Sequence, residues 1–76
     1  MDNIARFTNK YGDEWEFEYC PSTCSGVLRG SDIDWEESLV IDGYAPGLIL
    51  NREERAWLQL VWIQAIERER FKHVTP

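Results

Sequence analysis

The order of apolar and polar residues changes once along this chain, from a period of two to a period near that of a helix. The period of two is clearest at residues 14–19, Glu-Trp-Glu-Phe-Glu-Tyr, where three aromatic side chains alternate with three glutamates. A weaker strand pattern at residues 4–9 precedes it, and Gly12 lies between the two stretches, where its tolerance of positive φ suits a hairpin turn. The pattern therefore predicts an antiparallel hairpin.

Two further short strands are expected before residue 50. Residues 26–29 form a stretch that stops at Gly30, and residues 38–41 form another that stops at Asp42-Gly43. Pro46 followed by Gly47 suits a type II turn, in which the glycine takes positive φ. Four short strands and a turning segment are thus predicted ahead of the last third of the chain.

The last third has the pattern of one long helix, over residues 51–71. Asn51 is a good N-cap, and Glu54 follows three residues later, which is the spacing of a capping box. The other end is less well marked. Residues 71–76 are expected to fray, because β-branched Val74 and Thr75 and then Pro76 add little helical support.

Together these elements predict one α+β domain over residues 1–76, in the order β-β-β-β-α. An antiparallel sheet of about four strands would bury one face under the C-terminal helix and turn its glutamates to water. A small curled barrel capped by the helix is the alternative. The expected core consists of Phe7, Trp15, Phe17, Tyr19, Val27 and either Leu39 or Ile41 from the strands, with Leu58, Val61, Trp62 and Ala65 from the helix.

The predicted helix is apolar around nearly its whole circumference. At about 100° per residue, two apolar sets fall on opposite faces. The set that suits a core is Leu58, Val61, Trp62, Ala65 and Ile66, and the opposite set is Ala56, Trp57, Leu60 and Ile63. The second set needs a cover of its own, because exposed apolar patches of this size mark interaction sites. Either residues 44–50 fold over it, or it packs against another chain.

Charge is distributed unevenly along the sequence, whose formal net charge is −6. Residues 1–50 carry ten acids and three bases, whereas residues 51–76 carry four acids and five bases. An acidic surface repels phosphate backbones, so nucleic acid is not an expected partner, whereas a basic protein surface would be attracted. Trp35 stands among these acids next to Glu36 and could accept an Arg or Lys of a partner, or fold back onto the sheet edge.

Neither a membrane segment nor a signal sequence is recognised, so a cytoplasmic location without membrane contact is expected. Cys20 and Cys24 are the only cysteines, and His73 is the only histidine. Two thiols four residues apart could form a redox pair or half a metal site, but redox motifs usually have two residues between the thiols and zinc needs more ligands. They are interpreted as two thiols in a turn, and no metal or cofactor is expected.

Catalytic motifs are equally weak. The acidic residues 31–37 begin like a calcium loop, but Glu37 stands where such a loop needs glycine and Gly43 where it needs glutamate. The serines and threonine near residues 22–25 have no histidine beside them in sequence that would activate a nucleophile. No catalytic residue is assigned, and an enzyme is not expected.

The sequence therefore favours a non-catalytic protein-interaction module or small accessory subunit that uses the apolar helix stripe and the acidic sheet surface. Its expected contact residues are Trp57, Leu60 and Ile63, with Trp35 and Glu36 at the rim. The partner would be another protein or a second copy of the chain. The alternative is a small-molecule or cation-binding domain, with an aromatic-lined site between helix and sheet closed by residues 43–47. A thiol-dependent protein is the third and weakest reading.

Overall fold

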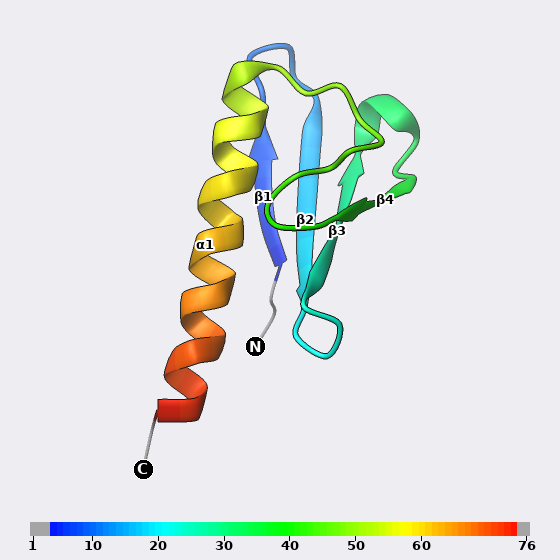
Figure 1. The fold of residues 1–76 in the computed structure, drawn as a ribbon. Helices are drawn as coiled ribbons and strands as arrows, with labels where there is room; N and C mark the ends of the chain where they lie inside the picture. The colour runs from blue at the N-terminus through cyan, green and yellow to red at the C-terminus, as the bar shows by residue number, and fades with distance from the viewer. Residues whose placement is uncertain (1–3, 75–76) are drawn as a thin grey trace.

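A computed structural model describes residues 4–74 of the chain, with side chains described as far as Phe71. Its elements follow the predicted order and form an antiparallel sheet with one long helix beside it (Figure 1). They are β1 (Ile4–Thr8), β2 (Glu14–Cys20), β3 (Ser25–Gly30), the 3-10 helix η1 (Ser31–Ile33), β4 (Glu37–Val40) and α1 (Arg52–Val74). The strands lie in the order β1-β2-β3-β4 and the sheet stays open, so the α+β prediction is confirmed and the barrel alternative is not.

The turns of the sheet depend on a few residues with positive φ. Gly12 has a φ of 88° in the β1–β2 hairpin, as predicted. After β4, Asp42 and Gly43 have φ values of 53° and 81°, and Ile41 and Tyr44 exchange backbone hydrogen bonds across them, which is the pattern of a type I′ turn. This turn sends the chain back over the sheet.

The turn at Pro46 forms, but not as the predicted type II turn. The Leu48 N–H donates to the Ala45 carbonyl at 3.0 Å, while Gly47 does not take positive φ. Pro46 fixes only the first central position of the turn, and glycine is accepted at the second position in either common type. The sequence alone therefore did not choose between them.

The start of α1 is confirmed as a capping box. The Glu54 N–H donates to Asn51 Oδ1 at 2.8 Å, and the Asn51 N–H donates to Glu54 Oε1 at 3.0 Å. The predicted helix end at Phe71 is too early, because the helix continues to Val74. No proline interrupts residues 71–74, so the backbone hydrogen-bond pattern can run on despite modest helix propensity. Thr75 and Pro76 lie outside the described residues.

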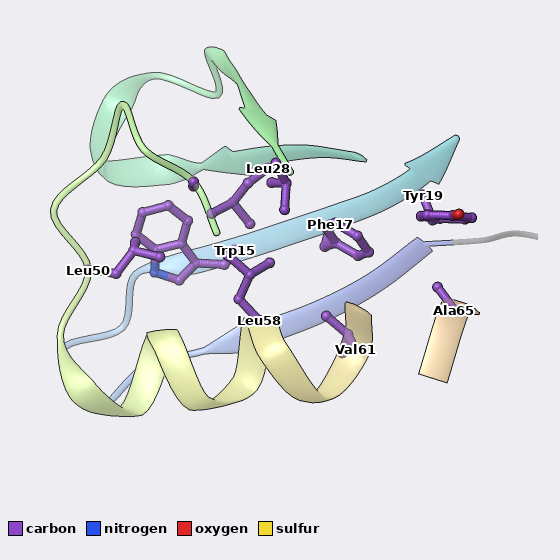
Figure 2. Packing of buried hydrophobic residues seen from close by; sticks show 10 residues of the cluster. Trp15, Phe17, Tyr19, Leu28, Leu50, Leu58, Val61 and Ala65 are labelled. Atoms are coloured by element: carbon purple, nitrogen blue, oxygen red, sulfur yellow. The ribbon is translucent and has the colours of Figure 1, made fainter. Parts of the chain in front are cut away.

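The core lies between the sheet and α1 and is built on the aromatic side of β2 (Figure 2). Trp15, Phe17 and Tyr19 are each 5% exposed or less. Leu58, Val61 and Ala65 of α1 are also buried, as predicted. The remaining buried apolar residues are Leu28, Val40, Ala45 and Leu50.

The predicted inward faces of β3 and β4 are wrong by one residue. Leu28 and Val40 are fully buried, whereas Leu39 and Ile41 are about half exposed, at 55% and 48%, and Val27 is only partly buried. Paired residues of antiparallel strands share a face, and Arg29 pairs with Glu16 on the polar side of β2. That pairing places Val27 on the polar side too, since a shift of one residue turns every side chain to the other face.

The segment between β4 and α1, residues 41–51, is called the connector here. Ala45 and Leu50 of the connector are buried in the core, and Leu48 packs against it. In Figure 1 the connector crosses the face of the sheet on the β2–β3 side, while α1 lies along the β1–β2 side. The connector therefore covers the part of the sheet that one helix leaves open.

Candidate protein-interaction surface

The outward face of α1 carries large apolar side chains that the fold does not cover. Leu60 is 55% exposed and Ile63 is 53% exposed, on the side of the helix opposite buried Leu58 and Ala65. The connector packs on the sheet and on the flank of α1 instead, and Gly43 approaches Trp62. Of the two covers considered from the sequence, folding of residues 44–50 over Leu60 and Ile63 is not observed.

Trp57, the third residue of the predicted stripe, is positioned differently. Its ring stacks on Phe7 of β1, with centroids 5.3 Å apart and planes inclined by 19°, and it is only partly buried. Trp57 therefore closes the β1 edge of the core and borders the outward face rather than lying within it. Stacking of Trp57 on Phe7 thus joins α1 to β1.

Two exposed aromatic residues that the sequence reading missed extend this surface. Tyr44 is 56% exposed and lines a small hollow of about 150 Å³ together with Ile63 and Trp62. Phe71 is 68% exposed and stands eleven residues after Leu60, which is close to three helical turns. The helical spacing from Leu60 could have identified Phe71 as part of this surface. The position of Tyr44 beside Ile63 could not be predicted, because it depends on the path of the connector.

Trp35 and Glu36 are not brought together with the helix stripe. Trp35 is 45% exposed and lines a hollow of about 200 Å³ with Thr8, Glu14 and Glu16 of the polar sheet face. Glu36 is exposed in the same loop. Because α1 packs on the opposite face of the sheet, these residues do not form a rim around Leu60 and Ile63. Asp34 and Trp35 both have positive φ, 56° and 61°, a costly conformation for residues with a Cβ.

The polar face of the sheet is acidic but largely paired. The Arg29 guanidinium contacts Glu16, Glu18 and Glu37 at 3.2, 3.3 and 2.9 Å, and Arg6 contacts Glu16 at 3.2 Å. Burial opposes the charge on Arg29, but its hydrogen bonds to Glu18 and Glu37 outweigh that effect and raise its pKa. The strands thus carry more glutamates than arginines, but each of the three glutamates around Arg29 forms an ion pair with it.

A third hollow lies between the connector and the first turns of α1 and is called the connector hollow here. Its volume is about 310 Å³. Its lining is mainly apolar and consists of Gly43, Tyr44, Ala45, Pro46, Leu48, Ile49, Leu50, Arg55 and Leu58. The alternative predicted from the sequence is an aromatic-lined ligand site between helix and sheet, closed by residues 43–47. Residues 43–46 line this hollow, but Tyr44 is the one aromatic residue in its lining.

Chemical groups suited to catalysis or metal binding are sparse in the described part of the chain. Cys20 and Cys24 are both free thiols, and Cys24 is exposed. No group of three or more histidine, cysteine or acidic side chains among residues 4–71 is arranged to hold a metal ion. The side chain of His73 lies outside the described residues.

Comparison of the chain with protein-family models, with curated proteins and with solved structures finds no match. Among the described helices, none has both the length and the apolar run that crossing a bilayer requires.

Proposed function

We propose that this chain is a non-catalytic protein-interaction module, or a small accessory subunit, that binds a protein partner through the outward face of α1. The observation that carries the proposal is the exposure of Leu60 and Ile63, at 55% and 53%, on a helix whose other face already fills the core. Burying these side chains against a partner would be favourable at about 25 cal/mol per Å² of apolar surface. The partner is another protein with an apolar ridge or helix, or a second copy of this chain.

The length of α1 supports the same proposal. It has 23 residues, against four to seven in each strand, and its orange-to-red end projects past the sheet in Figure 1. The molecule is correspondingly long, with extents of 44 × 21 × 21 Å. A helix that extends beyond its own sheet offers a partner a straight surface, as in helix-in-groove recognition.

The acidic face of the sheet would contribute to partner binding through long-range electrostatic attraction. A net charge of −6 favours encounter with a basic partner surface, and the effect weakens as salt is added. We place the module in the cytoplasm because Cys20 and Cys24 are free thiols, which fits a reducing compartment.

The test compares two leucines with the same exposure. Leu60 on α1 and Leu39 on the polar sheet face are both 55% exposed, so Leu60→Glu and Leu39→Glu add the same charge at equally exposed positions. We expect Leu60→Glu to weaken the affinity for the partner by at least about tenfold. Self-association is measured by sedimentation, and binding of another protein by capture from native extract. Leu39→Glu should leave both unchanged.

Two results would contradict the proposal. Equal effects of the two substitutions would show that only net charge matters. Unfolding of the Leu60→Glu variant under conditions where the Leu39→Glu variant stays folded would show that Leu60 belongs to the core. Circular dichroism of both variants, compared with the parent, separates these outcomes.

A further inference from the structure

The connector hollow is apolar but has a basic side. Arg55 lines it, and its Nη2 donates to the Leu50 carbonyl at 3.3 Å, which uses one of the five N–H donors of a guanidinium. Arg52 stands three residues earlier on the same flank of α1 and shares an adjoining shallow hollow with Arg55. Among the described side chains, neither arginine has an ion-pair partner. One cation without an ion-pair partner thus lines this hollow, and a second lines the adjoining one, in a chain of net charge −6.

The acid closest to Arg55 in sequence is already engaged elsewhere. Glu54 is 7% exposed and accepts hydrogen bonds from Asn9, Trp15 and the backbone of Asn51. The glutamates of the polar sheet face lie on the far side of the sheet from α1. Arg55 therefore keeps its remaining donors for a ligand.

The apolar wall of the hollow is exposed to water. Ile49 is fully exposed and Tyr44 is 56% exposed, while Leu58 below them is buried. A volume of about 310 Å³ is at the lower end of the range for small-molecule sites, which begins at roughly 300 Å³. Covering Ile49 and Tyr44 with an apolar group would remove their surface from water.

We propose that the connector hollow binds a small carboxylate with an apolar tail. The tail covers Tyr44, Leu48 and Ile49, and the carboxylate accepts charge-assisted hydrogen bonds from the Arg55 guanidinium, whose planar fork matches two carboxylate oxygens. This site lies on the flank of α1, apart from Leu60 and Ile63 on its outward face, and it shares only Gly43 and Tyr44 with the hollow beside Ile63.

The experiment uses three probes with the same eight-carbon tail: octanoate, octanol and octyltrimethylammonium. Binding is followed by backbone amide chemical shifts of the full chain, below the concentration at which the probes aggregate. We expect saturable shifts at Gly43, Gly47, Leu48 and Arg55 with octanoate, about tenfold weaker binding of octanol, and none of the cation. Equal binding of all three probes, no saturable binding, or shifts confined to Leu60 and Ile63 would each overturn the proposal.

Two variants test the role of charge. Arg55→Gln should reduce octanoate affinity to that of octanol and leave octanol binding unchanged. Arg70→Gln removes the same charge near the other end of α1 and should have no effect. Ile49→Glu changes a fully exposed side chain, so it spares the fold, and it should abolish octanoate binding and favour the cation. Unchanged octanoate affinity in both Arg55→Gln and Ile49→Glu would overturn the proposal.

Discussion

Trp15 donates its indole N–H to Glu54 Oε2 at 2.8 Å, and this bond joins the second strand to the first turn of the helix. The same oxygen accepts the Asn9 amide at 2.8 Å, while Glu54 Oε1 accepts the backbone N–H of Asn51. Asn9 in turn accepts the backbone N–H groups of Tyr11 and Asp13 at 2.9 Å. A capping residue that usually stabilises only its own helix here also orients the β1–β2 hairpin, because its carboxylate is buried among donors.

Replacing Glu54 with glutamine should therefore destabilise the whole domain. The amide keeps one acceptor oxygen but turns an NH₂ group toward N–H donors, so at least one buried donor loses its partner. We expect the unfolding free energy to fall by about 1–3 kcal/mol, measured by urea denaturation. Glu53→Gln removes the same charge from an exposed neighbour and should change stability by less than about 0.5 kcal/mol. Similar losses in both variants would show that the charge, and not the buried network, is what matters.

The glycines of β3 make room for the aromatic rings of β2. A Cβ on Gly30 would lie 2.5 Å from Cζ3 of Trp15, and one on Gly26 would lie 2.5 Å from Cε1 of Phe17. Gly30→Ala should lower the unfolding free energy by about 1–3 kcal/mol, because Trp15 has to leave its position over the strand and strain its bond to Glu54. The measurement is thermal and urea unfolding of the variant beside the parent.

Gly47→Ala is the matched control for that substitution. Nothing lies within 4 Å of a Cβ at Gly47, and this residue does not have positive φ. Alanine there should be neutral or stabilise the domain by up to about 1 kcal/mol, because it restricts the unfolded chain. If both alanine variants lost the same stability, glycine content in general would be the cause and not the contact with Trp15.

The elements that were predicted correctly depend on local sequence. The alternation of apolar and polar residues in β2 involves only neighbouring residues, and it is sufficient to locate the strand. The capping box joins Asn51 to Glu54, three residues later, and it is sufficient to locate the start of the helix. The inward faces of β3 and β4 were predicted wrongly because both faces of these strands carry apolar residues. The deciding contact is Arg29 with Glu16, which joins residues thirteen apart and has no local signature.

The candidate surface, like the fold, could be predicted from the sequence only where local periodicity decides the position of a side chain. Exposure of Leu60 and Ile63 follows from helical periodicity once Leu58 faces the core. The stacking of Trp57 on Phe7 and the position of Tyr44 beside Ile63 depend on how α1 and the connector pack, which periodicity does not describe. Residues 43–47 were predicted to close a ligand site, but the place of Arg55 in the connector hollow was missed for the same reason, since the sequence shows Arg55 only as one more charged residue of the helix.

Tyr19 provides a pH test of the contact between β2 and the C-terminal half of α1. Burial raises the pKa of this tyrosine above its ordinary value of 10.0, and the nearby Cys24 and Glu69 raise it further. The folded state therefore holds the phenol proton more tightly than the unfolded state does. The stabilising contribution is complete below pH 10.0 and is lost as pH rises through the folded pKa.

Titration of phenolate absorbance should show one tyrosine ionising later than the rest, and Tyr19→Phe should remove that late step. Glu69→Gln should bring the step to lower pH, because it deletes a negative charge that opposes phenolate formation. Tyr11→Phe, which changes an exposed ring at 73% exposure, should leave the late step in place. A late step that survives Tyr19→Phe would show that Tyr19 is not its source. A late step that is unchanged in Glu69→Gln would mean that the end of β2 and this part of α1 are not packed together at alkaline pH.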